Sequence, residues 1–413
     1  MKRTLLIALL LALCLLCACG TAPAPAATPT PEPTPEPTPI PTPTPTPEPV
    51  DVTLPDGRVI SIKETTALDL HTLKAADAEA TAEILKQLPN LKTIDLGRQG
   101  EGEIGWKEVG LFQSAFPEAD VNYGFELWGK SFTTLDEKMD FNHIEMDDQG
   151  AAVREVLPYM TRCTYLDMDF CSVDSEHMAA IRDENPGMEV VWRIWFGLYD
   201  KFSVRTDCER ILASNFDSGL NTENTQELKY CTKVKYLDVG HQNIDDISFL
   251  GYMPDLEICV ISLYQPWRDL SPIANCTKLE WLEIELTQCD DIAPLAALKN
   301  LKHLDMTNLA NLAGADFTPL HELTQLERLF IAETPITPEE LEALQAALPN
   351  TEIVTRSMAL DQPGGWKYQL DGKMVPYFEH VYEAFDYKHY NSAASYAKND
   401  PLYYPHEEEL PAD

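Results

Sequence analysis

The sequence predicts an α/β chain, a solenoid of tandem repeats with a parallel β-sheet on its concave face, preceded by a disordered stalk rich in Pro and Thr. Two observations support this prediction. From residue 234 to residue 350, one apolar pattern occurs five times, at spacings of 22, 23, 22 and 25 residues. Across residues 20–50, Pro alternates with Thr and Glu, a composition that favours an extended chain over a packed core.

Each short repeat opens with apolar residues at its positions 1, 4 and 6. Positions 4 and 6 alternate as strand residues do, so both side chains should point into the core. Position 1 is occupied by Val234, Leu256, Leu279, Leu301 and Leu326. The residues after each predicted strand, such as "DDISFL" and "DDIAPLAAL", should supply the return turn.

This L-x-x-L-x-L pattern resembles the leucine-rich repeat, whose period is roughly 20–29 residues, and the return turns are similar to those of bacterial internalins. The resemblance implies a parallel sheet and a protein that binds rather than reacts. One departure is that position 9 lacks the usual Asn and holds Gln242, Tyr264 and Thr287 instead. The ladder of hydrogen bonds that Asn normally builds must therefore be replaced.

A longer period precedes the short repeats. Leu96, Met168 and Val239 end similar motifs and lie 72 and 71 residues apart. We interpret residues 51–228 as long, degenerate strand–helix repeats on the same solenoid axis, and residues 229–358 as the leucine-rich repeats of 22–25 residues. The alternative for the first range is a separate α/β cap domain.

The N-terminus has the features of an export signal. Lys2 and Arg3 precede an apolar run that is too short to span a bilayer, and the run ends in Leu16-Cys17-Ala18-Cys19. This ending resembles the lipobox of bacterial lipoproteins. The resemblance implies a signal peptide over residues 1–19, a lipid at Cys19, and a location on the extracellular face of the bacterial cell membrane. A plain secretory signal cleaved nearby is the alternative.

The residues after Cys19 would then form a spacer. Residues 20–50 would reach roughly 90 Å as extended polyproline-II chain, at about 3.1 Å per residue. The whole chain carries 31 Lys and Arg against 67 Asp and Glu, a formal net charge of -36. Such a field repels phosphate backbones, so nucleic acid is not expected as a partner.

No motif in the sequence points to a cofactor, a metal or a catalytic centre. The His and Cys residues lack zinc spacing. The pairs Asp245-Asp246 and Asp290-Asp291 are interpreted as turn and helix caps, with Ca²⁺ binding as the alternative. Seven cysteines follow the expected signal, mostly at inward repeat positions, and we expect buried thiols rather than a set of disulfides.

The candidate binding site is the concave, solvent-facing side of the predicted sheet, to which repeat positions 3, 5 and 7 should point. Aromatic residues are frequent at position 3 and acids at position 5, and such ladders suit an interface. Replacing Tyr236 and Trp281 by Ala should abolish capture of a ligand and leave the melting temperature nearly unchanged. The alternative is that the acids belong to ordinary solvated strands. The predicted site residues are Tyr165, Tyr236, Asp238, Trp281, Glu283, His303, Asp305, Arg328 and Phe330.

The last part of the chain, residues 359–413, is rich in Tyr and is expected to cap the open end of the solenoid or to form a docking tail. Phe378, Tyr382 and Phe385 fall on one face of a predicted helix. The function expected overall is a cell-surface lipoprotein that binds a protein partner, with a basic partner favoured by the acidic row. The alternative is a glycan-binding or cell-wall-binding module, and an enzyme is not expected.

Overall fold

The computed structural model describes residues 50–200, 202–214, 219–356, 362–385, 387 and 403–404. The expected signal peptide, Cys19, all but the last residue of the Pro/Thr stalk and the extreme C-terminus lie outside these residues. Val50–Asp413 form one compact unit, and it is the only one described below. None of the helices in the described part of the chain is long and apolar enough to cross a membrane.

The unit begins with an antiparallel hairpin, β1 (Asp51–Thr53) and β2 (Val59–Ser61). A strand–helix array follows, comprising β3 (Ala67–Asp69), η1 (Ala75–Asp77), α1 (Ala78–Leu85), β4 (Thr93–Arg98), α2 (Trp106–Ala115), β5 (Asp120–Leu127) and β6 (Lys130–Thr133). The strands β3, β4 and β5 are parallel, and β6 turns back to pair with β5. Helices α1 and α2 thus connect neighbouring parallel strands.

The same order of elements occurs a second time. It comprises β7 (Lys138–Asp140), α3 (Ala151–Val156), η2 (Leu157–Tyr159), β8 (Tyr165–Asp167), α4 (Ser175–Glu184) and β9 (Glu189–Val191). These three strands form a separate parallel sheet. A hairpin follows, in which η3 (Leu198–Asp200) lies between β10 (Arg193–Phe196) and β11 (Phe202–Arg205), and it leads to the short repeats. β19 (Tyr403–Tyr404) pairs with β11.

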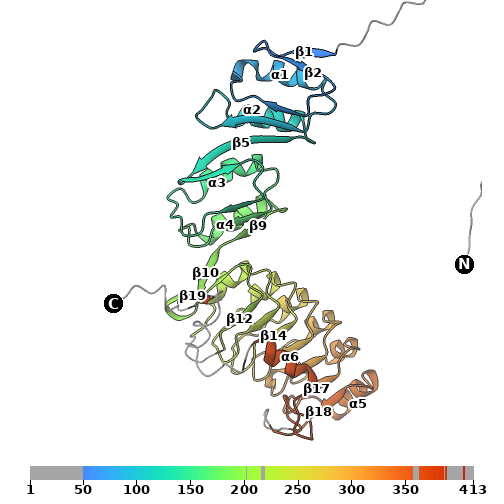
Figure 1. Cartoon of the computed structure of the whole chain (residues 1–413). Helices are drawn as coiled ribbons and strands as arrows, with labels where there is room; N and C mark the ends of the chain where they lie inside the picture. Colours follow the sequence, from blue (N-terminus) through green and yellow to red (C-terminus); the bar gives the residue numbers. More distant parts are fainter. Residues whose placement is uncertain are drawn as a thin grey trace, which may run out of the picture. The chain divides into compact units, whose positions relative to one another are not determined.

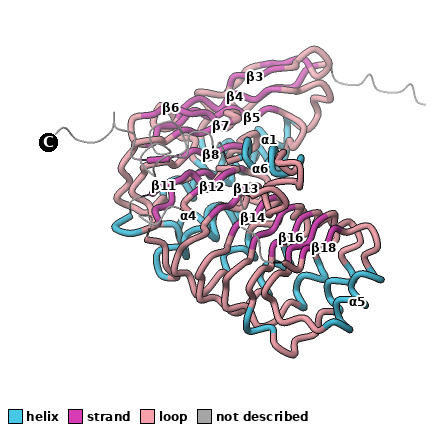
Figure 2. Tube along the Cα trace, turned by 90° about the horizontal axis from the view of Figure 1, so that it is seen from below, coloured by secondary structure: helices cyan, strands magenta, loops and turns pink. Residues whose placement is uncertain are grey.

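The short repeats form one parallel sheet in sequence order (Figures 1 and 2). Its strands are β12 (Arg210–Leu212), β13 (Tyr236–Asp238), β14 (Ile258–Val260), β15 (Trp281–Glu283), β16 (His303–Asp305), β17 (Arg328–Phe330) and β18 (Glu352–Val354). In β13 to β17 each strand covers repeat positions 3 to 5, and equivalent positions pair across the sheet. The register predicted from the apolar pattern is therefore the observed one.

The chain returns between strands through short 3-10 helices on the opposite side of the sheet (Figure 2). They are η5 (Glu223–Tyr230), η6 (Ser248–Tyr252), η7 (Ser271–Asn275), η8 (Ala293–Ala297), η9 (Ala310–Leu312) and η10 (Thr318–Glu322), and α5 (Pro338–Ala347) precedes β18. The paired acids have the predicted capping role. Asp246 accepts a hydrogen bond from the N–H of Ser248, and Asp291 accepts one from the N–H of Ala293, both at 2.8 Å.

A backbone ladder replaces the missing Asn at position 9. Position 8 of every short repeat is left-handed, with φ between 53° and 67° for His241, Leu263, Leu286, Asn308 and Glu333. This turn lets the position 8 N–H donate to the position 7 carbonyl of the next repeat, as His241 does to Ser262 at 3.1 Å and Leu286 does to Thr307 at 3.0 Å. Main-chain groups thus join successive turns. Side chains add to this ladder, since Gln242 at position 9 accepts from the N–H of Leu220 at 2.9 Å and Gln265 donates to the carbonyl of Val239 at 2.6 Å.

The core runs continuously from the second long array into the short repeats. One cluster of buried side chains extends from Phe125 to Leu348, and a second, from Leu54 to Tyr123, fills the first long array. All seven cysteines of the described residues are buried and none forms a disulfide among those residues. Burial raises the pKa of Cys276 and of Cys289 to about 12, so these thiols stay protonated and weakly nucleophilic.

Candidate functional site

Eight of the nine predicted site residues lie on one surface, which we call the sheet face. It is formed by the side chains of positions 3 and 5 on β13 to β17 and by those of position 7, two residues after each strand ends. Tyr236, Trp281, His303 and Arg328 align at position 3, and Asp238, Glu283, Asp305 and Phe330 align at position 5. Only Tyr165 lies elsewhere, on β8 of the second long array.

The sheet face is covered by the chain's own C-terminal segment, which we define as residues 362–385 and 387. This segment contains helix α6 (Pro376–Ala384), which lies beside β14 to β17 (Figure 1). Trp281 is 0% exposed, Asp305 0%, His303 2% and Phe330 2%. The expectation that these side chains face solvent is therefore wrong, because about 20 residues of downstream sequence pack over them.

Aromatic rings form the centre of this interface. Trp281 stacks on Tyr377 with ring centroids 5.8 Å apart, and it lies 4.5 Å from the ring of Trp366. Phe378 packs on Trp281 from the same helix at 5.7 Å, and Phe330 meets Trp366 edge to face at 5.3 Å. Interlocked rings of this kind are the usual anchors of protein–protein contacts.

Hydrogen bonds fix the ends of the segment. The Tyr377 hydroxyl donates to Glu280 at 2.8 Å, and the Tyr387 hydroxyl donates to Asp238 at 2.7 Å. Arg328 donates from Nη1 to the carbonyl of Trp366 at 3.2 Å. Aromatic contacts and hydrogen bonds together fix one orientation of the segment on the sheet.

The position of the segment also corrects the expected role of the C-terminus. We expected residues 359–413 to cap the open end of the repeats or to form a docking tail, and the described part instead covers the face of the sheet. Phe378 and Phe385 are buried there as the helical pattern predicts, and Tyr382 is half-buried. An aromatic helix face is thus matched to an aromatic row at position 3.

Several acids of position 5 have a structural task that the sequence did not reveal. Asp238 accepts a hydrogen bond from the N–H of Gly240 at 3.1 Å, and Asp305 accepts one from the N–H of Thr307 at 3.0 Å. Asp69, Asp95, Asp140 and Asp167 make the same bond to the N–H two residues on. These carboxylates hold the turn that leaves each strand. Asp238 and Asp305 are buried, so they do not belong to the solvated strands of the alternative.

Burial leaves the acids of the sheet face poorly solvated. Burial raises the pKa of Asp238 to about 6, and burial together with the neighbouring Glu283 raises that of Asp305 to about 7. The pKa of Glu285, at position 7, is raised to about 9 by burial and then by Asp305 and Glu283. His303 is affected in the opposite sense, because burial lowers its pKa to about 4. All four groups are thus driven towards their neutral forms.

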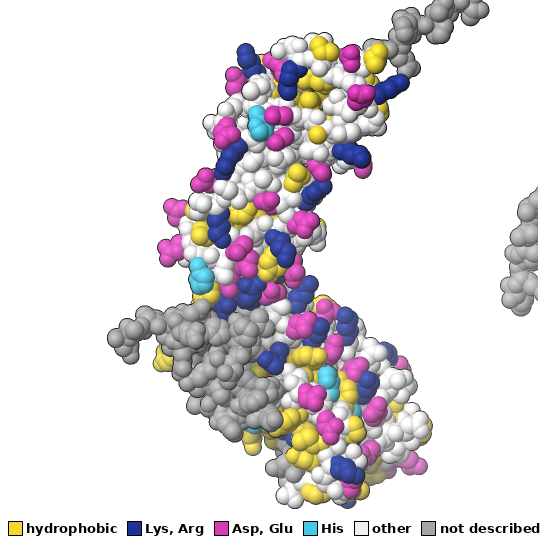
Figure 3. All heavy atoms as spheres, in the orientation of Figure 1, with side chains coloured by type: hydrophobic (Ala, Val, Ile, Leu, Met, Phe, Trp, Pro, Cys, Tyr) yellow, Lys and Arg dark blue, Asp and Glu magenta, His cyan; other side chains and the backbone are white. Residues whose placement is uncertain are grey.

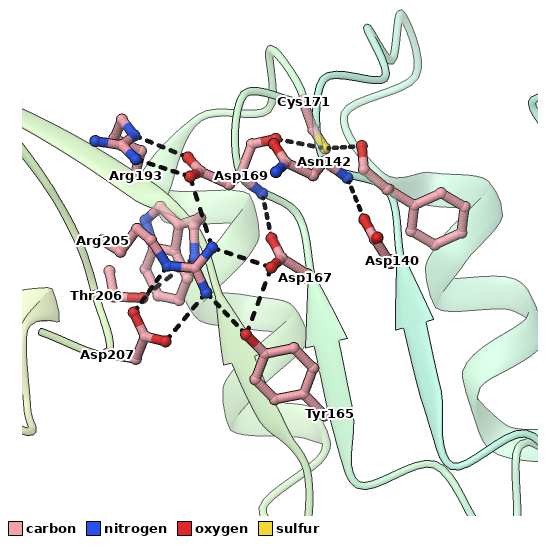
Figure 4. Close-up of polar contacts among 12 residues, drawn as sticks. Asp140, Asn142, Tyr165, Asp167, Asp169, Cys171, Arg193, Arg205, Thr206 and Asp207 are labelled. Carbon is pink, nitrogen blue, oxygen red and sulfur yellow. Dashed lines mark hydrogen bonds and ion pairs between the residues drawn. The ribbon is translucent and has the colours of Figure 1, made fainter. Parts of the chain in front are cut away.

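Tyr165 belongs to a separate polar network at the start of the short repeats (Figure 4). Arg205 of β11 donates to the Tyr165 hydroxyl at 2.8 Å and to Asp167 at 3.0 Å. Beside it, Arg193 of β10 donates two bonds to Asp169, at 3.0 and 2.9 Å. The side chains of Arg193 and Asp169 are only 6% and 4% exposed. Tyr165 is thus held by internal partners and is not part of the sheet face.

Sequence reasoning missed Glu285, Ser262 and the residues of the C-terminal segment. Glu285 and Ser262 occupy position 7, which was expected on the same face as positions 3 and 5, but the predicted site residues were taken from positions 3 and 5 only. Arg205 lies outside any repeat and leaves no periodic signal.

On the side drawn in Figure 3, acidic and basic side chains are interspersed over the described surface. Among the described residues, no group of His, Cys, Asp or Glu side chains could hold a metal ion.

Comparisons with known proteins return bacterial repeat proteins at low similarity. No protein-family model matches the sequence, and no curated protein matches it significantly. A leucine-rich-repeat protein of Leptospira interrogans is 18% identical, with 66% of this chain and 74% of that chain covered and a TM-score of 0.33. Internalin InlF of Listeria monocytogenes is 17% identical, with 72% and 85% covered and a TM-score of 0.30. Internalin C2 of the same organism is 19% identical, with 56% and 88% covered and a TM-score of 0.31.

Proposed function

We propose that this chain is a bacterial surface lipoprotein whose leucine-rich-repeat solenoid binds a protein partner through its concave face. The observation that carries the proposal is the docking of α6. The sheet face holds α6 by aromatic anchors and by the hydrogen bond of Tyr377, and it bonds the backbone of Trp366 ahead of the helix, so it is suited to recognise protein.

The docked helix indicates the chemistry of the partner. Its buried residues Phe378, Val381 and Phe385 follow helical spacing, and Tyr377 adds a hydroxyl aimed at Glu280. This is the helix-in-groove mode, in which an amphipathic helix lays its apolar side on a complementary surface. A partner would present a similar aromatic helix and would compete with the C-terminal segment for the sheet face.

Binding in trans tests this proposal directly. A chain that ends at residue 361 is mixed with a labelled synthetic peptide of residues 362–387, and fluorescence anisotropy measures the affinity. We expect saturable binding, at least tenfold weaker in Trp281→Ala, because an aromatic anchor at the centre of an interface typically contributes about 2 kcal/mol or more. Tyr252→Ala, which removes an exposed aromatic residue from η6, is the matched control. Equal affinity in both variants would refute recognition by this face.

The aromatic row suits protein better than carbohydrate. A sugar platform presents ring faces to solvent, whereas Trp281 is fully buried beneath Tyr377 and Trp366. Glycan or cell-wall binding would therefore require complete release of the C-terminal segment. A glycan array probed with the chain ending at residue 361 and with the longer chain separates the two functions.

The lipid anchor is the second part of the proposal. Cys19 would carry the lipid, and the Pro/Thr stalk of residues 20–50 would hold the repeats away from the extracellular face of the membrane. Metabolic labelling with a fatty-acid analogue should label the natural chain and should not label Cys19→Ala. Label that persists in Cys19→Ala would place the anchor elsewhere, and a lack of label in the unmodified chain would refute the anchor.

A further inference from the structure

A cavity of about 340 Å³ lies between the sheet face and the C-terminal segment. From the sheet it is lined by acids and small residues of positions 5 and 7, among them Asp238, Glu283, Glu285 and Ser262. From the segment it is lined by Phe378, Tyr382 and other residues. Its volume is at the lower end of the range of small-molecule sites, roughly 300–1,000 Å³, and its mix of aromatic walls and a few convergent polar groups is typical of them.

Two polar side chains of this cavity each have an oxygen atom without a hydrogen-bond partner among the described residues. Glu285 is 3% exposed and Ser262 is 0% exposed, and no described residue forms a hydrogen bond with Glu285 Oε1 or with Ser262 Oγ. Buried polar atoms are nearly always hydrogen-bonded, and a buried acceptor without a donor destabilises the folded state. Both atoms belong to residues that line the cavity, so a ligand placed there could supply the missing hydrogen bonds.

The charged groups around the cavity determine whether a cationic or an anionic ligand is favoured. Asp238, Glu283 and Glu285 line it, and Asp305 lies close enough to Glu285 to affect its ionisation. Lys367 is the lysine among the described lining residues. Its Nζ lies 5.4 Å from the ring centroid of Phe378, and its charge acts on Glu285 in the direction that lowers the pKa of that carboxyl. A cationic group in the cavity would lower the pKa of these acids and favour their ionised forms, and the attraction of several carboxylates would then exceed the repulsion from Lys367.

We infer that this cavity binds a small organic amine, with its primary ammonium group at Glu285 and Ser262 and its apolar body between Phe378 and Tyr382. A primary ammonium carries three donors, which suits unbonded oxygen atoms better than a quaternary ammonium would. Since no metal-binding group occurs among the described residues, a metal cation fits the site less well. This ligand differs in class from the protein partner proposed above, and it would contact both the sheet and the docked segment.

Binding should be coupled to proton release. Burial, Asp305 and Glu283 keep the pKa of Glu285 near 9 when the cavity is empty, so at pH 7 this carboxyl is mostly protonated. An ammonium group beside it would favour the ionised form and expel the proton. The other titratable or charged groups that face the cavity are Asp238, His241, Lys367, Tyr368, Tyr382 and Tyr387. Affinity should therefore rise between pH 6 and pH 8.

The test uses the chain of residues 20–413 and 2-phenylethylamine as the probe, measured by isothermal titration calorimetry in two buffers of different ionisation enthalpy. We expect saturable binding, release of a proton at pH 7, and at least about tenfold weaker binding of the neutral 2-phenylethanol and of Glu285→Gln, since each loses a charge-assisted hydrogen bond. Glu342→Gln, at an exposed position of α5, is the matched control and should bind as the unmodified chain does.

The role of Lys367 and the choice of amine over other ligands can be tested separately. Lys367→Met should bind the amine more tightly, because it removes the competing cation. If Lys367 already serves as the counter-ion, the unmodified chain binds no amine, and this would overturn the inference. Equal binding of the alcohol and the amine, an unchanged affinity in Glu285→Gln, or binding of Ca²⁺ in place of the amine would also overturn it. The peptide test above is independent, because it measures docking of the segment and uses no amine.

Discussion

The burial of Trp281 beneath the C-terminal segment gives a prediction whose size can be worked out. From the sequence, Trp281→Ala should leave the melting temperature nearly unchanged. In the structure the indole is fully buried, contacts Trp366, Tyr377 and Phe378, and donates from Nε1 to Glu283 at 2.8 Å. Replacing a buried Trp by Ala costs about 3–5 kcal/mol of the free energy of unfolding.

The cost should depend on whether the segment is present. In a chain that ends at residue 361, the contacts with Trp366, Tyr377 and Phe378 are gone, and Trp281 lies on an open sheet face. There the same substitution should cost about 1 kcal/mol or less, as exposed positions usually do. The difference between the two chains, about 2–4 kcal/mol, is the interaction of Trp281 with the segment in a double-mutant cycle.

The assay is urea unfolding followed by far-UV circular dichroism for four proteins: each chain length with and without Trp281→Ala. Tyr252→Ala is the control, because that ring is 56% exposed and belongs to η6. It should change the free energy of unfolding by about 0.5 kcal/mol or less in both chains. If Trp281→Ala costs the same in both chains, the segment does not bury this residue and the reasoning is refuted.

The remaining predictions concern pH, an ion network and the thiols. The pKa values of Asp305 and Glu285 are raised to about 7 and 9, so the folded chain keeps protons that the unfolded chain releases near pH 4. The melting temperature should therefore fall as the pH is raised from about 5 to 9. Glu285→Gln should flatten the upper part of this profile, and a flat profile in the unmodified chain would contradict the burial of these acids. Arg205→Met should destabilise the chain to urea by about 2 kcal/mol or more, since it removes the cation that is paired with Asp167 and Asp207. Arg154→Met, at an exposed ion pair, should cost less than about 1 kcal/mol. In the chain of residues 20–413, all seven cysteines should react with a thiol reagent in denaturant without reductant; two or more disulfides would show that the thiols are not free.

Much of the repeat architecture could be predicted from the sequence because it is local. Positions 4 and 6 alternate within a strand and recur at a fixed period, so the strands, their register and the buried rows follow from residues close in the chain. The capping role of Asp246 and Asp291 is local as well, since a side chain that bonds to the N–H two residues on needs no distant partner.

The state of the candidate site could not be predicted in the same way. Trp281 and Tyr377 are separated by 96 residues, and nothing periodic connects a row of repeat positions with a helix after the last repeat. The acids of position 5 were ambiguous for a different reason. A carboxylate that holds a turn through the N–H two residues on and a carboxylate that awaits a ligand have the same place in the pattern, and only three-dimensional contacts distinguish them.

The docking of α6 also affects how the molecule unfolds and folds. In an ordinary repeat array each unit contacts only its neighbours, so the ends fray and the array loses cooperativity as it lengthens. Here a helix from the end of the chain bridges strands in the middle of the array, between Tyr236 and Phe330. The central and terminal repeats cannot separate until this bridge opens, so they should melt together. The same bridge adds contacts of long sequence separation, which slow folding, so a chain without the segment should reach its folded state sooner and leave it in more than one step.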